Sequence, residues 1–135
     1  MTWAVLFVVV LATVEHGLGT RRCIALFAAG HVGATLVTAL GLWVGIRTGA
    51  FSPRIEDALD VGVSYGFAAA AAAFTFLLPR RLRLPYAAAL IGYLAFELAA
   101  DRSFSDAGHL VAVGIGFALW RIGFADPRRR AVAPA

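Results

Sequence analysis

The sequence contains no lysine, asparagine or glutamine, and it has a single cysteine, Cys23. One cysteine cannot form a disulfide within the chain and matches no zinc-ligand spacing, so neither a disulfide framework nor a cysteine-based metal site is expected. Only 15% of the residues are charged, against roughly 25% in soluble globular domains. This composition is not that of an ordinary water-soluble domain.

Apolar residues fill the chain instead, at 61% of the total. They form five runs, which are Thr2–Val14, Cys23–Ile46, Val61–Leu78, Tyr86–Ala100 and Ala107–Phe124. A helix needs about 20 residues to cross a bilayer core; the second, third and fifth runs meet this length, while the first and fourth are short and would tilt or extend. We expect one all-α domain, residues 1–125, that forms a polytopic bundle of about five transmembrane helices in a lipid bilayer.

All twelve basic residues are arginines, and they lie in short clusters between the apolar runs. This arrangement fixes membrane topology and leaves no basic face for a phosphate backbone, so no nucleic-acid partner is expected. If all five runs span, nine arginines lie on one side and three on the other. The positive-inside rule then predicts an N-terminus outside the cell membrane and a C-terminus in the cytoplasm. The basic tail, 126–135, is expected to be cytoplasmic and disordered.

The residue usage, rich in alanine, glycine, valine and arginine, is typical of a GC-rich bacterial genome. Small residues recur at short spacings within the apolar runs. Gly30 and Gly33 lie on the second run, and Ala112 and Gly116 lie on the fifth. Such spacings let helix backbones approach closely in lipid, so these residues are predicted to pack at helix contacts.

Ser64 lies near the start of the third run, in the stretch Asp60–Gly66. If this run enters the membrane from outside at Asp60, Ser64 is about one turn in, at a depth of ~5–6 Å. The fifth run enters from the same side at Asp106, which puts His109 at a depth of ~4–5 Å. The two side chains are therefore predicted to share a depth near the outer face.

A serine becomes a nucleophile when a nearby base takes its proton, and histidine is the usual base. Ser64 and His109 are thus a candidate catalytic dyad, with glycines beside Ser64 leaving room for a substrate backbone. Another interpretation stays open: Ser64 is a packing residue bonded to its own backbone, and His109 reaches interfacial water.

Two further polar residues lie within the runs. His31, mid-way along the second run, is too deep to partner Ser64 easily and is expected to hydrogen-bond a neighbouring helix. Glu97 lies near the outer end of the fourth run. It is expected to be a partly exposed interfacial carboxylate, to orient His109 or to pair with Arg102.

Three segments together resemble the rhomboid intramembrane serine proteases. Gly62-Val63-Ser64-Tyr65 is similar to the Gly-x-Ser-Gly nucleophile motif of that family, with Tyr65 at the second glycine. His109 to Gly116 is similar to the His-x-x-Gly-x-x-x-Gly segment, with Ala112 at the first glycine. Glu15 to Arg22 looks like the family's acidic-x-x-Leu-Gly-Ser/Thr turn.

The resemblance implies a rhomboid-like fold in which Ser64 is the nucleophile and His109 the base. Gly62, Tyr65 and Gly66 would hold the oxyanion or shape the site, no metal or organic cofactor would be needed, and the substrate would be a transmembrane protein cleaved near the outer face. Thr2–Val14 lacks the histidine and asparagine that the family usually carries there, and the family's first helix and external loop have no counterpart. An active protease, a fragment of a longer product and a catalytically silent protein that binds other membrane helices all stay open.

Overall fold

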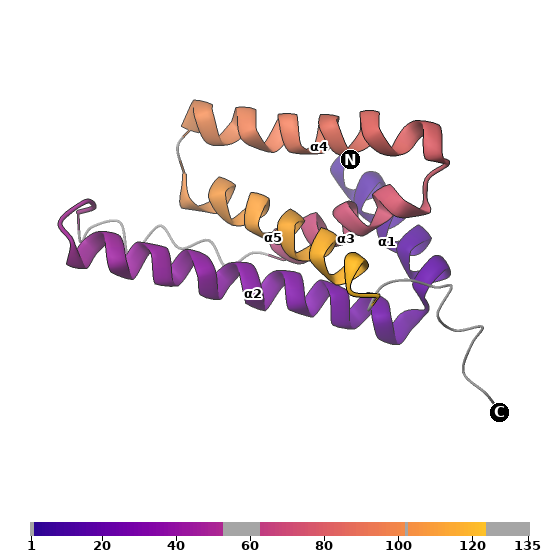
Figure 1. The fold of residues 1–135 in the computed structure, drawn as a ribbon, viewed down its shortest axis with the longest axis horizontal. Helices are drawn as coiled ribbons and strands as arrows, with labels where there is room; N and C mark the ends of the chain where they lie inside the picture. The colour runs from indigo at the N-terminus through magenta and orange to yellow at the C-terminus, as the bar shows by residue number, and fades with distance from the viewer. Residues whose placement is uncertain (1, 53–62, 102, 124–135) are drawn as a thin grey trace.

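The structure is a computed structural model, and it describes residues 2–52, 63–101 and 103–123. These residues form α1 (Thr2–Leu18), α2 (Thr20–Arg47), α3 (Ser64–Leu77), α4 (Arg80–Asp101) and α5 (Phe104–Arg121), as Figure 1 shows. No strand occurs among them, so the predicted all-α bundle is confirmed. Gly62 and the tail, 126–135, lie outside the described residues.

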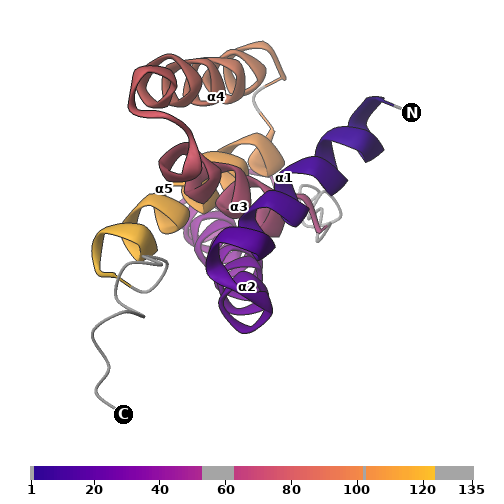
Figure 2. The same ribbon diagram turned by 90° about the vertical axis from the view of Figure 1, so that its right-hand side faces the viewer.

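Helix α3 is the centre of the bundle. It contacts each of the other four helices, and Figure 2 shows α1, α2 and α5 around it with α4 on a separate side. The run Ala68–Ala73 is buried throughout. Because alanine side chains are short, neighbouring helices approach the α3 backbone closely, which gives the van der Waals contact that holds helices together in lipid.

Glycines on the surrounding helices complete these contacts. A Cβ at Gly30 would collide with the side chain of Ala69, and a Cβ at Gly116 would collide with the Ala69 carbonyl oxygen. A Cβ at Gly33 would lie 2.7 Å from Ile115 Cδ1 on α5. Helices α2 and α5 therefore meet α3 and each other at glycines.

Residues Glu15–Arg22 form the tight junction between α1 and α2. Gly19 takes a φ of 82°, a left-handed conformation that glycine adopts without steric cost. Leu18 is fully buried, and the Thr20 hydroxyl donates to Glu15 Oε1 at 2.9 Å. The turn is thus fixed by one apolar anchor, one glycine and one side-chain hydrogen bond.

Helix α4 begins at Arg80, six residues before the predicted start at Tyr86. The chain turns at Leu78 and Pro79, and Pro85 lies inside the helix. Arg83 donates to the carbonyl oxygens of Leu78 at 3.0 Å and Phe76 at 2.8 Å. Its guanidinium therefore satisfies carbonyls that the end of α3 leaves without helical partners.

The lengths and surfaces of the helices suit a membrane. By length and composition α2 and α4 can each cross one, while α1 and α3 are shorter apolar helices, so the spanning length expected for the third run is not met by the described part of α3. Large apolar side chains lie exposed on the outside, among them Val8 at 62%, Leu36 at 64% and Phe96 at 68%. Apolar surface of this kind is stable against lipid and unfavourable in water.

Candidate active site

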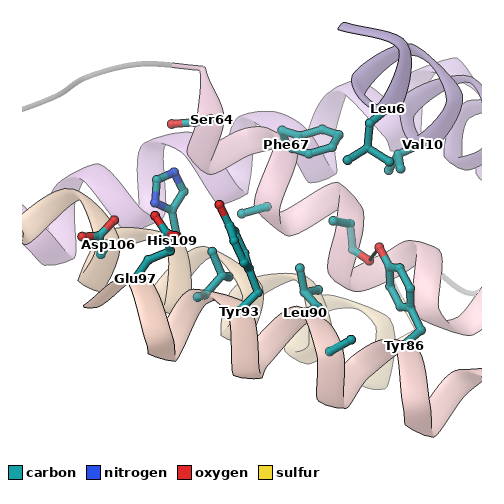
Figure 3. Close-up of a pocket in the computed structure, with 14 residues that line it drawn as sticks. Leu6, Val10, Ser64, Phe67, Tyr86, Leu90, Tyr93, Glu97, Asp106 and His109 are labelled. Carbon is teal, nitrogen blue, oxygen red and sulfur yellow. Dashed lines mark hydrogen bonds between the residues drawn. The ribbon is translucent and has the colours of Figure 1, made fainter. Parts of the chain in front are cut away.

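A pocket of about 440 Å³ lies between α1, α3, α4 and α5. Its lining is mostly apolar, and Figure 3 shows Ser64, His109, Glu97 and Asp106 gathered at one end with Tyr86 at the other. The residues that line it are Leu6, Val10, Ser64, Phe67, Ala68, Ala71, Tyr86, Ala89, Leu90, Tyr93, Leu94, Glu97, Asp106 and His109. The structure thus brings Ser64 and His109 into one cavity from two separate helices.

Ser64 is the first residue of α3, whereas the sequence predicted a position one turn inside the helix. Among the described residues, the first backbone hydrogen bond of α3 runs from the Phe67 amide to the Val63 carbonyl at 3.2 Å. The amides of the first turn of α3 point towards its N-terminal end, where the positive end of the helix dipole lies beside Ser64. This environment favours negative charge close to Ser64.

His109 is held near the start of α5 by a well-formed helix cap. The Ser103 hydroxyl accepts from the Asp106 amide at 3.1 Å and donates to Asp106 Oδ2 at 2.6 Å. His109 follows Asp106 by three residues, which places both side chains on one face of the helix. The cap thus fixes where α5 begins and where the imidazole enters the pocket.

Tyr65 packs behind His109 and does not line the pocket. Its ring meets the imidazole edge-on, with centroids 5.1 Å apart and planes at 77°, and only 3% of the residue is exposed. Any Cβ at Gly108 would collide with the Tyr65 ring. The bulk of Tyr65, where the family motif has glycine, is therefore accommodated by a glycine on α5, and the pocket stays open.

Gly66 also lies away from the pocket, because a Cβ there would lie 2.5 Å from Cε1 of the Phe27 ring on α2. Ala112 is fully buried in the same apolar cluster as Tyr65 and Ala34. Among the described residues predicted to form the site, Ser64 and His109 line the cavity and the small residues pack the helices around it.

One wall of the pocket comes from α4 and was not predicted as a surface. Tyr86, Leu90, Tyr93 and Glu97 all line the cavity. They are spaced by four, three and four residues, which is the repeat of a single helix face. This periodicity was the signal available in the sequence. The periodicity marks one face of α4, but it does not say whether that face points into the bundle or towards lipid.

The end of the pocket far from Ser64 is apolar, and contacts between Tyr86 and α3 hold its wall in place. The Tyr86 hydroxyl donates to the Ala71 carbonyl oxygen at 3.3 Å, and its ring meets Phe74 edge-on at 5.4 Å. Leu6 and Val10 of α1 line the cavity across from α4. Chemically, the cavity combines a hydroxyl, an imidazole and two carboxylates at one end with room for an apolar side chain along its length.

The Nδ1 atom of His31 is buried and has no hydrogen-bond partner among the described residues, so it does not make the interhelical hydrogen bond that the sequence predicted. The His31 carbonyl oxygen accepts from the Thr35 hydroxyl on the same helix at 2.8 Å. The described parts of the chain contain no group of three or more histidine, cysteine, aspartate or glutamate side chains that could hold a metal ion.

A protein-family model described as rhomboid-like protein matches residues 1–128, a span that includes all of α1 to α5. No curated protein and no solved structure matches the chain.

Proposed function

This chain belongs to the rhomboid-like protein family, and from that premise we propose that it is an intramembrane serine protease. Ser64 is the proposed nucleophile and His109 the proposed general base. The substrate class is a transmembrane protein whose peptide bond is cleaved near the outer face of the membrane. No metal or organic cofactor takes part in the proposed reaction.

One observation carries the proposal: Ser64 and His109 line the same end of a 440 Å³ pocket. Figure 3 presents the two side chains on one side of that pocket, with apolar residues along the remainder. A nucleophile and a base must converge on the same space for the chemistry to occur. The apolar remainder suits the side chains of a membrane-embedded substrate.

In the proposed reaction, His109 takes the proton from the Ser64 hydroxyl as its oxygen attacks the carbonyl carbon of the substrate. The carbonyl oxygen gains negative charge and accepts hydrogen bonds from backbone amides near Ser64 at the start of α3. His109 then gives its proton to the leaving amine. Water, activated by the same imidazole, releases the acyl group from Ser64.

In this chain, stabilisation of the oxyanion would depend on backbone N–H donors. The sequence has no asparagine, and Thr2–Val14 has no histidine, so the side-chain donors usual in the family's second helix are absent. Losing one oxyanion donor typically lowers turnover by ~10²–10³. We therefore expect a slow protease that is more easily detected by covalent labelling than by substrate turnover.

The proposed orientation follows from the arginine distribution. An N-terminus outside and a C-terminus in the cytoplasm place the start of α3 and of α5 at the outer face. The candidate site then opens towards the outside, where water for the second half-reaction is available.

The proposal is tested by labelling the detergent-purified protein with a fluorophosphonate probe. We expect labelling that is abolished in Ser64→Ala and reduced at least about 100-fold in His109→Ala. Ser105→Ala and His16→Ala are matched controls, because neither residue lines the pocket, and both should label like the parent protein.

Absence of labelling under conditions that label an active rhomboid protease would refute the proposal. That result would favour the second candidate, a catalytically silent family member that binds other membrane helices. The observation in favour of this candidate is the missing asparagine and histidine noted above.

A further inference from the structure

We infer that Glu97 positions His109, so that the reaction centre is a serine–histidine–carboxylate set whose acid comes from α4. The inference deepens the proposed function and rests on it. It concerns a residue that the serine and histidine motifs do not contain, and it assigns Glu97 a positioning role only, because its carboxylate reaches the substrate solely through the imidazole.

Glu97 and His109 both line the polar end of the pocket, and in Figure 3 the Glu97 carboxylate points towards the imidazole ring. Glu97 is half-buried, on the face of α4 that forms the pocket wall. Tyr93 lies one turn earlier on the same face of α4 and lines the same pocket.

The other carboxylate in the pocket, Asp106, is attached differently. Asp106 is bonded through both its amide and its carboxylate to Ser103, in the cap of α5. These bonds hold its side chain at the start of the helix. Glu97 comes from a different helix and faces His109 from across the cavity, so it is the carboxylate placed to direct the ring towards Ser64.

In such a set, the imidazole nitrogen that faces Glu97 carries a proton and donates a hydrogen bond to the carboxylate. This fixes the tautomer and leaves the other nitrogen unprotonated, facing Ser64. When Ser64 attacks, its proton moves to that nitrogen, and the ionised Glu97 stabilises the resulting imidazolium without itself becoming protonated.

On the core side, the His109 ring packs against Tyr65, with 5.1 Å between the ring centroids. Among the described residues, the charged or titratable side chains around His109 are Tyr65 from α3, Tyr93 and Glu97 from α4, and Asp106 from its own helix. Of the two carboxylates, Asp106 is held in the cap of its own helix, whereas Glu97 comes from a neighbouring helix.

The test compares Glu97→Gln with Glu15→Gln in the full chain, using the second-order rate of fluorophosphonate labelling at Ser64. We expect Glu97→Gln to slow labelling by at least about tenfold and Glu97→Asp to recover part of the rate. Glu15→Gln makes the same chemical change at an exposed residue that does not line the pocket, and it should stay within about threefold of the parent. Equal rates for Glu97→Gln and the parent, or an equal loss in Glu15→Gln, would overturn the inference.

A second readout does not require activity and separates failure of this inference from failure of the proposed function. Side-chain ¹⁵N spectra of histidine-labelled protein, assigned with His109→Ala, report the tautomer of neutral His109. We expect one tautomer in the parent and a mixture in Glu97→Leu, which removes the acceptor altogether. If the parent is not labelled by the probe, the proposed function fails while this spectrum still decides the role of Glu97. The same tautomer distribution in both proteins would refute that role.

Discussion

The contact between Gly108 and Tyr65 gives a prediction that joins the stability of the bundle to the geometry of the candidate base. In Gly108→Ala the new Cβ would lie 2.5 Å from the Tyr65 hydroxyl oxygen and 2.7 Å from its Cε1. Tyr65 is 3% exposed and packed against α2 and α5, so its ring has little space to retreat. Relief requires a shift of the ring away from His109 or a separation of α3 from α5.

The size of the effect is obtained by difference. Overpacking a well-packed core by one methyl typically costs ~1–3 kcal/mol. A Gly-to-Ala change within a helix has an opposing gain of up to about 1 kcal/mol. Gly114→Ala on the same helix isolates that gain, because a Cβ at Gly114 meets nothing within 4 Å. The difference between the two variants is therefore the collision itself, about 1–3 kcal/mol.

The assay is unfolding in mixed detergent–SDS micelles, followed by far-UV circular dichroism, with fluorophosphonate labelling measured on the same samples. Gly108→Ala should unfold more readily and label more slowly than Gly114→Ala. In a Tyr65→Ala background the ring is gone, and Gly108→Ala should have no destabilising effect, so a double-mutant cycle returns the collision energy. Equal stability of Gly108→Ala and Gly114→Ala, or an unchanged effect without the Tyr65 ring, would refute the reasoning.

Three further substitutions test the packing of α3. Arg83→Met removes both donors to the last carbonyls of α3 and should destabilise the fold by about 1–3 kcal/mol, whereas the exposed Arg81→Met should change it by less than about 0.5 kcal/mol. Tyr86→Phe deletes the hydroxyl that donates to α3 and should cost about 1 kcal/mol, with no loss expected if the 3.3 Å bond does not form. Gly116→Ala collides with α3 and should be less stable than Gly92→Ala by ~1–3 kcal/mol, because both variants share the helix-propensity gain and only the first meets another helix. Similar unfolding of the two variants would contradict this packing.

Much of the helical architecture follows from the pattern of apolar residues. Five apolar runs predicted five helices because a lipid-facing helix needs an unbroken apolar stretch, and this signal depends only on local sequence. The helix boundaries were predicted less well. The fourth apolar run was marked from Tyr86, but α4 begins at Arg80, and Pro85 lies inside it beyond the first turn.

The candidate site was predictable in its two central residues and not in its walls. Ser64 and His109 stand out because polar groups are rare in apolar runs and these two share a predicted depth. The packing position of the Tyr65 side chain could not be predicted from the sequence, because the ring fits only where Gly108 of α5 faces it. The contribution of α4 also depends on tertiary packing, which decides which face of that helix lines the cavity.

The most direct test of the account is to locate the covalent adduct after the protein reacts with a fluorophosphonate. Peptide mass spectrometry should find the adduct on Ser64, with no modification at Ser52, Ser103 or Ser105, and the adduct should disappear in His109→Ala. An unmodified Ser64 in folded protein, or modification that persists unchanged without the His109 imidazole, would contradict the claim that these two side chains form the reaction centre.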